Sequence, residues 1–257
     1  MHNLGQTRSS QQPNHLLLTP DTFVRTALPG MKACSAIVHV SPAVGAMFTQ
    51  YTAEFEAGGE LGSTSTQRFI FVIEGGVRVE VDGKSNELGA RGYAYLPEGS
   101  HHRIAAAKES RVAVIEKHYQ PLDSVKPPHL IISSEDAISS HPLGDDPNLQ
   151  VKCLLPDLPP DAASFDFAVN TMVYQPGAAL SMVEMHVMEH GLIMLEGGGI
   201  YRLGDSWYPV TAGDFIWMGP WCPQWFGAIG KVPAKYLIYK DWNRHPLAGM
   251  LATGKPR

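Results

Sequence analysis

The chain has 257 residues, of which 44% are hydrophobic and 18% charged, with a formal net charge of −5. This length allows one large domain or two of ordinary size. The charge gives no reason to expect nucleic acid or an acidic membrane surface as a partner, and no apolar run approaches the roughly 20 residues that span a bilayer. The polar residues 1–15 lack the apolar core of a signal peptide, so a cytoplasmic location is expected.

The three cysteines do not form a recognisable pattern. Cys34, Cys153 and Cys222 are odd in number and lie far apart. They therefore fit neither a disulfide framework nor a zinc motif with paired cysteines. We interpret them as reduced thiols with a packing role.

Short segments bounded by turn residues recur along the chain. The 25 glycines and 20 prolines are spread throughout, which favours strands and turns over long helices. Residues 77–81 (Val-Arg-Val-Glu-Val) alternate strictly before the turn Asp82-Gly83. Further strands are predicted at 69–73, 200–203, 215–218 and 236–239. These patterns predict an all-β protein.

An internal repeat emerges when the sequence is slid by 123 positions. Gly76 then falls on Gly199, Asp82 on Asp205 and Lys117 on Lys240. One shared offset without a gap indicates a duplicated β-domain. A Pro-, Ser- and Asp-rich stretch over about 123–160 joins the halves, and it could contain strands near 130–132 and 151–155. The predicted domains are residues 1–135 and 136–257.

The segment 184–190 carries three potential metal ligands just ahead of the glycine-rich turn 197–199. They are Glu184, His186 and His190, and Gln224 follows 34 residues later. On a strand, residues 184, 186 and 190 have the same parity and point to one face. A carboxylate and two imidazoles on one face make a site for a divalent metal. Two histidines alone could be ordinary half-buried residues, but the added Glu184 and Gln224 favour the metal site.

The first half of the repeat does not carry the same ligands. At the offset of 123, the ligand positions correspond to Leu61, Ser63, Gln67 and His101. Of these, only the histidine binds a metal well. The first domain is therefore expected to lack metal ligands, and the second to hold the metal site and the catalytic residues.

The duplicated β-domain with its ligand cluster resembles the bicupins. In cupins a first motif runs glycine, His-x-His, glutamate, six residues and glycine, and a second motif carries Gly-Asp, proline and a final histidine. Here Glu184 stands at the first histidine, His186 at the second and His190 at the glutamate. Six residues lead to Gly197, and Gln224 stands near the place of the final histidine. The resemblance implies two tandem jelly-roll-like barrels.

This rearranged ligand set resembles the (S)-ureidoglycine aminohydrolase family of allantoin degradation, along nearly the whole chain. The resemblance implies that the substrate is a small ureide, that water converts (S)-ureidoglycine to (S)-ureidoglycolate and ammonia, and that the protein forms homo-oligomers. It implies Mn²⁺ as cofactor, bound by Glu184, His186, His190 and Gln224. It also implies substrate contacts from Tyr201, Tyr236 and Lys240.

The chemistry of the residues agrees with these roles. Nitrogen and oxygen donors without a thiolate suit Mn²⁺ or Fe²⁺ better than a structural zinc. Glu184 could accept a proton from water, and Lys240 could hold a carboxylate or move a proton. Tyr201 and Tyr236 could instead be barrel packing, and Lys240 a solvated partner of Asp241.

Two other functions remain open from the sequence. Two histidines and a carboxylate are also the ligands of Fe(II) oxygenases, so another manganese or iron cupin enzyme, a dioxygenase or decarboxylase, is one alternative. The other is a non-catalytic bicupin that stores or senses a ligand.

Overall fold

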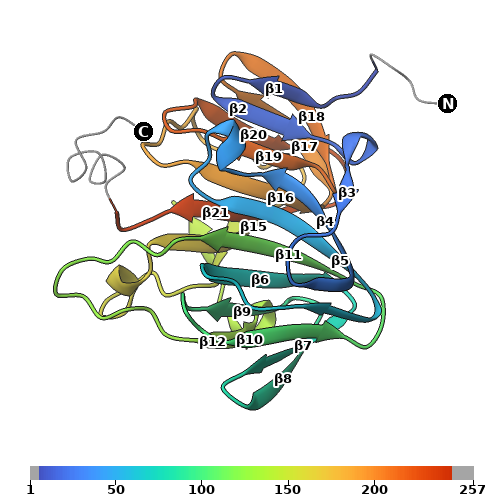
Figure 1. The fold of residues 1–257 in the computed structure, drawn as a ribbon. Helices are drawn as coiled ribbons and strands as arrows, with labels where there is room; N and C mark the ends of the chain where they lie inside the picture. Colours follow the sequence, from blue (N-terminus) through green and yellow to red (C-terminus); the bar gives the residue numbers. More distant parts are fainter. Residues whose placement is uncertain (1–5, 245–257) are drawn as a thin grey trace.

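Two barrel-like assemblies of β-strands lie one above the other in this computed structural model, which describes residues 6–244 (Figure 1). The sheet of the first half runs in the order β12 (Ile131–Ser134), β9 (Gly92–Leu96), β6 (Gln67–Glu74), β11 (Ser110–Lys117), β5 (Thr49–Leu61), β10 (His102–Ala106), β7 (Gly76–Val81) and β8 (Lys84–Gly89). Beside β5 lies β4 (Met31–Val40), and beside β4 lies β3 (Arg25–Thr26).

The second half contains two sheets. The larger runs in the order β1 (Ser10–Gln12), β2 (His15–Leu18), β19 (Phe215–Met218), β16 (His190–Glu196), β21 (Ala234–Asp241), β15 (Phe167–Tyr174), β14 (Asp146–Cys153) and β13 (His141–Leu143). The smaller runs β18 (Ser206–Thr211), β17 (Gly198–Leu203) and β20 (Gln224–Ala228). Short 3-10 helices are η1 (Pro20–Thr22), η2 (Pro42–Val44), η3 (Glu135–Ala137) and η4 (Ala162–Ser164).

The all-β prediction is confirmed, and each of the five predicted strand segments lies within an observed strand. The predicted connection over 123–160 also contains strands, namely β12, β13 and β14. No helix within residues 6–244 has the length and apolar character needed to cross a membrane. The expected location in the cell stays a prediction.

The internal repeat is real, but its offset is 122 residues rather than 123. Strands β7, β8 and β10 correspond to β17, β18 and β20 at 122, residue for residue. Gly75 and Gly197, which both have positive φ, at 79° and 63°, also match at 122. Because successive side chains of a strand point to opposite faces, a slip of one residue exchanges interior for exterior.

The corrected offset changes which residues correspond. Gln224 matches His102, not His101, and His190 matches Arg68, not Gln67. Two extra residues between β20 and β21 shift the last strand pair, since β11 and β21 match at an offset of 124. Lys240 therefore corresponds to Glu116 and not to Lys117.

In the first barrel these corresponding residues contact one another. Arg68 donates from Nε to Glu116 Oε1 at 2.8 Å and from Nη1 to His102 Nε2 at 2.7 Å. His102 Nδ1 donates to the carbonyl oxygen of Ser100 at 3.0 Å, which leaves Nε2 to accept from the guanidinium. The Arg68 side chain is buried. A guanidinium thus joins the imidazole and the carboxylate at the centre of this barrel.

The hairpin β1–β2 crosses from the amino terminus to the sheet of the second half. Strand β2 pairs antiparallel with β19, from Leu18 opposite Phe215 to His15 opposite Met218. Figure 1 shows these first strands lying against the strands near the end of the chain. Along the middle of the chain, β12 belongs to the first sheet and β13 to the second. A division between residues 135 and 136 stays a prediction.

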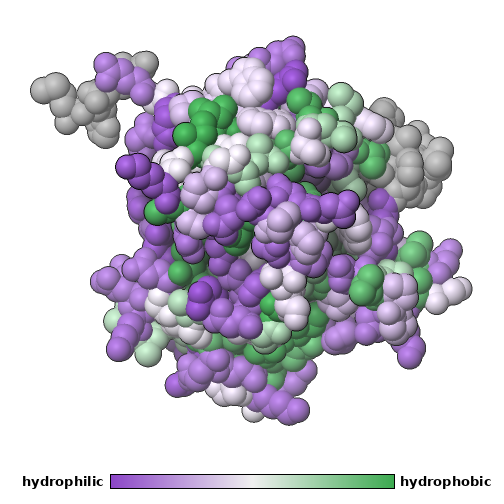
Figure 2. Space-filling model, turned by 180° about the vertical axis from the view of Figure 1, so that it is seen from behind, coloured by the Kyte–Doolittle hydropathy of each residue, from purple (hydrophilic) through white to green (hydrophobic). Residues whose placement is uncertain are grey.

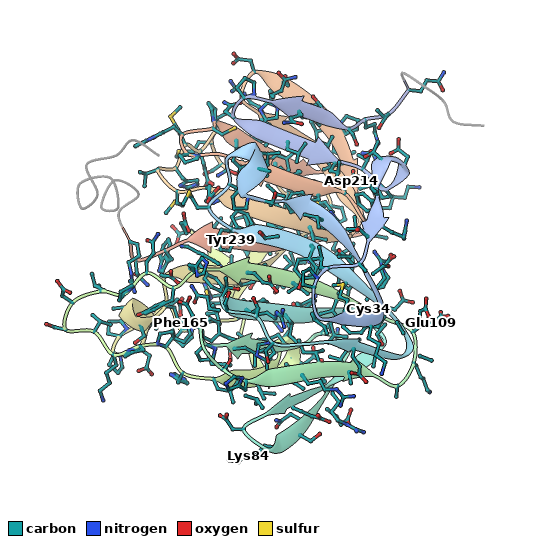
Figure 3. All side chains as sticks on the ribbon, in the orientation of Figure 1. Cys34, Lys84, Glu109, Phe165, Asp214 and Tyr239 are labelled. Atoms are coloured by element: carbon teal, nitrogen blue, oxygen red, sulfur yellow. The ribbon has the colours of Figure 1, made fainter. Side chains whose placement is uncertain are left out.

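Three hydrophobic clusters stabilise the part of the chain that the structure describes. One fills the first barrel, one fills the second, and the third lies between the halves. The third cluster includes Phe48, Phe167 and Tyr239, and the Tyr239 ring stacks on Phe48 with centroids 4.0 Å apart. Tyr239 and Phe165 mark this layer in Figure 3. Because apolar side chains from both halves share this core, the halves are packed as one unit.

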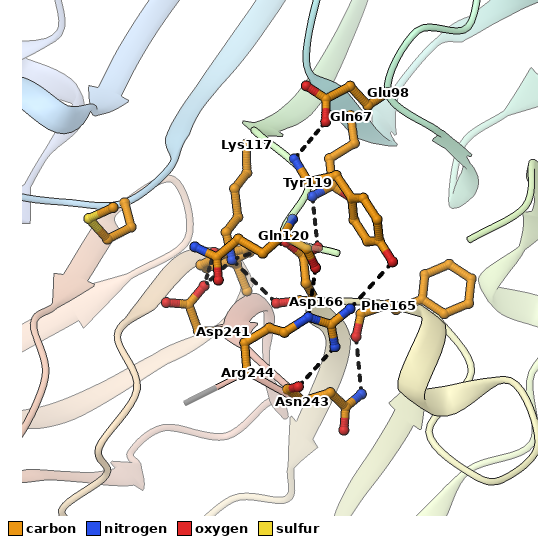
Figure 4. A network of polar contacts seen from close by, with 12 residues as sticks. Gln67, Glu98, Lys117, Tyr119, Gln120, Phe165, Asp166, Asp241, Asn243 and Arg244 are labelled. Carbon is orange, nitrogen blue, oxygen red and sulfur yellow. Dashed lines mark hydrogen bonds and ion pairs between the residues drawn. The ribbon is translucent and has the colours of Figure 1, made fainter. Parts of the chain in front are cut away.

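A polar network borders the layer between the halves (Figure 4). Lys117 Nζ donates to Asp241 Oδ1 at 2.6 Å and lies 3.5 Å from Asp166 Oδ2. Gln67 Nε2 donates to Asp166 Oδ1 at 2.7 Å, and Arg244 Nε donates to the carbonyl oxygen of Gln120 at 2.7 Å. Lys117 and Gln67, which the offset of 123 aligned with Lys240 and His190, therefore connect the two halves.

Candidate metal and substrate pocket

All seven residues singled out from the sequence line one pocket in the second barrel. Its volume is about 120 Å³. The polar wall consists of Glu184, His186, His190, Tyr201, Gln224, Tyr236 and Lys240. The apolar wall consists of Leu143, Met172, Leu180 and Ile238. A few polar groups converging within apolar surroundings are typical of a small-molecule site.

The ligand-bearing segment is not the strand that the sequence predicted. Residues 185–189 are irregular, Glu184 forms only an isolated β-bridge, and β16 begins at His190. The bridge joins Glu184 to Gln224, whose backbone N–H groups donate to each other's carbonyl oxygens at 2.8 and 2.9 Å. The segment is further held where Trp221 N donates to the carbonyl oxygen of His186 at 2.7 Å. Pairing across the barrel, rather than strand parity, brings these side chains together.

His190 is oriented as a metal-binding imidazole would be. It is buried, and Nδ1 donates to the carbonyl oxygen of Glu189 at 2.7 Å. This hydrogen bond assigns the tautomer and leaves the lone pair of Nε2 available. Burial, followed by the charge of Lys240, lowers the pKa of His190 to about 3. The ring is therefore neutral, the form in which imidazole binds a metal.

The remaining donors surround the same space. His186 Nε2 lies 3.1 Å from Glu184 Oε2, and the rings of His186 and His190 have centroids 5.1 Å apart. Within residues 6–244, no group of three or more His, Cys, Asp or Glu side chains is placed so that it could hold a metal ion. The four predicted donors meet instead as neighbours in the pocket wall. Two imidazoles, a carboxylate and an amide oxygen fit Mn²⁺ or Fe²⁺ by their chemistry.

Lys240 and the tyrosines approach from neighbouring strands. Lys240, Ile238 and Tyr236 alternate along β21 and face the pocket, whereas Tyr201 comes from β17. Burial lowers the pKa of Lys240, and the thiol of Cys153 and the carboxylate of Glu184 oppose this shift. Burial raises the pKa of both tyrosines far above the usual range, so both hydroxyls stay protonated.

The sequence did not reveal every residue that shapes the pocket. Tyr174 lies behind the wall, with its hydroxyl 2.7 Å from that of Tyr236. Met172 and Tyr174 alternate on β15, as Ile238 and Tyr236 do on β21, so a period of two could have identified them. Leu143 comes from the segment expected to be a connection, where no pattern pointed to the pocket.

Comparison with known proteins agrees with the fold and the residues. Residues 43–119 match the family model for a EutQ-like cupin domain, and residues 170–239 match that for a cupin domain. An (S)-ureidoglycine aminohydrolase from Arabidopsis thaliana is 40% identical, over 95% of this chain and 80% of that protein. The chain belongs to the (S)-ureidoglycine aminohydrolase family. It is a bicupin and, as a member of this family, a hydrolase.

A bacterial relative and several solved structures are also similar to this chain. The member from Escherichia coli is 32% identical, over 90% of this chain and 89% of that protein. A putative glyoxylate-induced protein from Pseudomonas aeruginosa superimposes with a TM-score of 0.84 at 29% identity, covering 94% of this chain and 93% of its own. An oxalate decarboxylase from Bacillus subtilis, at 12% identity and a TM-score of 0.69, shares the fold alone.

Proposed function

We propose that the protein hydrolyses (S)-ureidoglycine to (S)-ureidoglycolate and ammonia in purine catabolism, with Mn²⁺ as cofactor. Glu184, His186, His190 and Gln224 would hold the cation. The observation that supports this most strongly is the pocket itself, because seven residues chosen for these roles from the sequence line one cavity. Relatives that carry the name of this activity cover 95% of the chain, which adds support from outside the site.

The residues of the pocket can support each part of the reaction. When bound, Mn²⁺ supplies the Lewis acidity that polarises the substrate. Glu184 accepts a proton as water forms a bond to the α-carbon. Lys240 gives a proton to the amino group as the carbon–nitrogen bond breaks, so that neutral ammonia leaves. The lowered pKa of Lys240 makes its ammonium group a better acid.

The tyrosines and the apolar wall fix the substrate. The hydroxyls of Tyr201 and Tyr236 stay protonated and donate hydrogen bonds to substrate oxygens. Leu180, Met172 and Ile238 limit access of bulk water to one side. Water then reaches a single face of the α-carbon, which yields one enantiomer.

The direct test is ammonia release by the manganese-loaded protein. (S)-ureidoglycine is generated in place from allantoate, because it decays unaided, and the product is resolved on a chiral column. Rapid ammonia release with only (S)-ureidoglycolate is expected. A rate equal to spontaneous decay, with manganese confirmed in the protein, would reject the assignment.

The two alternative functions, an oxygenase and a non-catalytic bicupin, can be tested on the same protein preparation. Dioxygen consumption by the iron-loaded protein would favour an oxygenase, and a protein purified without stoichiometric metal would favour a non-catalytic bicupin. Neither outcome is expected, because Lys240 adds a proton donor beside the predicted ligands.

Removal of the metal should abolish turnover reversibly. After dialysis against a chelator, activity is expected to fall to the background rate, because the four donors then present no Lewis acid to the substrate. Addition of Mn²⁺ should restore it, and circular dichroism should remain that of the loaded protein. Full activity of the metal-free protein would exclude a catalytic cation.

Replacement of Tyr174 by phenylalanine should impair substrate binding more than the chemical step. The substitution removes the hydroxyl that lies 2.7 Å from that of Tyr236, while keeping the buried ring. A lost hydrogen bond of about 1 kcal/mol corresponds to a rise in KM of roughly fivefold, with kcat little changed. The matched control is Tyr93→Phe, a buried tyrosine of the other half, which should leave both constants unchanged.

Self-association is part of the proposal. Met185 lies within the ligand-bearing segment 184–190, Met182 just before it, and Trp221 pairs with it through its backbone; their surfaces are 56%, 66% and 60% exposed. Figure 2 shows hydrophobic side chains gathered in patches on an otherwise largely hydrophilic face. Exposed apolar surface of this kind favours contact between copies. Light scattering of the full chain is expected to give a multiple of 28.0 kDa.

A further inference from the structure

The two strands that carry His190 and Lys240 have one face in the pocket and the other against the first half. His190 pairs with Lys240, and both side chains line the pocket. The next pair along the same strands is Gly191 with Tyr239, and Tyr239 is buried in the layer between the halves. Successive side chains of a strand point to opposite faces. The sequence neighbours of His190 and Lys240 therefore reach the first half.

The carboxylate of Glu189 connects this region to the first half. Its Oε1 accepts from the backbone N–H of Met47 at 2.7 Å, and its Oε2 accepts from the indole Nε1 of Trp217 at 2.9 Å. Met47 lies between η2 and β5 of the first half, whereas Trp217 lies on β19 of the second. Glu189 is 1% exposed, so bulk water does not compete for either oxygen. Each oxygen thus accepts from an N–H group of a different half.

The backbone of Glu189 fixes the ring of His190. Its carbonyl oxygen accepts from His190 Nδ1 at 2.7 Å and, more weakly, from the backbone N–H of Asp241 at 3.4 Å. The carboxylate of Asp241 accepts from Lys117 Nζ, on β11 of the first half, at 2.6 Å (Figure 4). Side chain and backbone of Glu189 therefore join groups of the first half to the imidazole in the pocket wall.

A close approach on the other side of His190 agrees with this arrangement. A Cβ added to Gly191 would lie 2.6 Å from Cζ of Phe48 and would also meet the side chain of Gln50. Phe48 stands directly before β5, and Gln50 lies within it. Glycine allows a neighbouring group to pack this closely against the backbone. The first half thus holds His190 on both sides, through Glu189 and Gly191, although it contributes no residue to the pocket.

We propose that Glu189 is the residue through which the first half positions His190 for binding the cation. This inference rests on the proposed function, in which His190 is a ligand. A metal-binding imidazole is oriented by the group that accepts its other N–H. Here that group is the Glu189 carbonyl, and the carboxylate, held by Met47 and Trp217, keeps the carbonyl in place. The first half serves the reaction without a ligand of its own, because it determines where one ligand stands.

Glu189→Gln tests this positioning role. The variant keeps the size of the side chain, but its amide nitrogen must face one of two N–H donors, so the contact with Met47 or Trp217 is lost. Mn²⁺ is expected to bind about tenfold more weakly, the scale for partners of metal-bound histidines. Electron paramagnetic resonance of the free ion, in titrations of the full chain, gives the affinity. Circular dichroism establishes that the variant is folded.

Gly191→Ala tests the other side of His190 independently. The added methyl group must displace the strand from Phe48, so Mn²⁺ affinity should fall here as well. The matched control is Tyr95→Phe, which removes a buried hydrogen bond of 2.6 Å to Gln67 in the same layer between the halves. It should lower the melting temperature and leave Mn²⁺ affinity unchanged.

The outcomes separate this role from the proposed function. Wild-type Mn²⁺ affinity in folded Glu189→Gln would overturn the positioning role alone, provided that the wild type binds Mn²⁺ and releases ammonia. An equal loss of affinity in Tyr95→Phe would also overturn it, because the effect would then be general to the layer. If the wild type binds no Mn²⁺, the proposed cofactor is wrong and the positioning role fails with it.

Discussion

Replacement of Glu184 by glutamine is expected to lower kcat by about a thousandfold, the scale of a lost general base. The substitution keeps the size of the side chain and an oxygen that can still bind a cation, but the amide cannot accept a proton from water. Because Glu184 pairs through its backbone with Gln224, the loop should retain its course. Ammonia release at saturating substrate gives kcat, and atomic emission measures manganese in the same sample.

Metal content decides how this result is interpreted. A variant that keeps its manganese and loses turnover assigns the proton transfer to Glu184. The matched control is Glu196→Gln, an exposed glutamate at the other end of β16, which should behave as the wild type. Near wild-type turnover of Glu184→Gln with bound manganese would exclude Glu184 as the base.

Replacement of Arg68 by methionine is expected to destabilise the first barrel severely. Arg68 is buried and contacts both Glu116 and His102, and the Tyr51 hydroxyl also donates to Glu116. Methionine fills much of the space but leaves a partly buried carboxylate without its cation. Breaking a buried pair in this way costs about 3–5 kcal/mol.

Thermal unfolding measures this loss. For a chain of this size, each kcal/mol corresponds to roughly 2–4 °C, so the melting temperature should fall by about 10 °C. Arg78→Met, which breaks an exposed ion pair on the hairpin β7–β8, is the control and should melt as the wild type does. A melting temperature of Arg68→Met close to that of the wild type would show that the barrel does not depend on this arginine.

The strands were predictable because their residues alternate and turn residues bound them. The register of the repeat was not, because few identities survive between the halves and the glycine-rich turn has one glycine more in the second half. At Gly197-Gly198-Gly199 an alignment by residue type slips by one position. Side-chain faces alternate with a period of two, so that slip assigned Gln67 and His101 to places that belong to Arg68 and His102.

The candidate pocket was predictable for a different reason than the one given. Glu184 and His186 were chosen because strand parity would align them with His190, yet their segment is irregular. The residue types alone made the pocket predictable. The backbone pairing of Glu184 with Gln224, and not strand parity, brings the side chains together. The cavity between the two halves, which His39 and Ile193 help to line, could not be predicted from the sequence. Its lining comes from segments separated by up to about 190 residues and has no shared motif.

The buried guanidinium of Arg68 in the first barrel also limits how this gene can evolve. His102 and Glu116 both depend on Arg68, so a mutation that removes the arginine alone would destabilise the fold before any new ligand could be recruited. Several substitutions would have to be fixed together for the first copy to acquire a pocket lined like that of the second. After the duplication, selection can therefore change the pocket of one copy while the other is retained for its architecture.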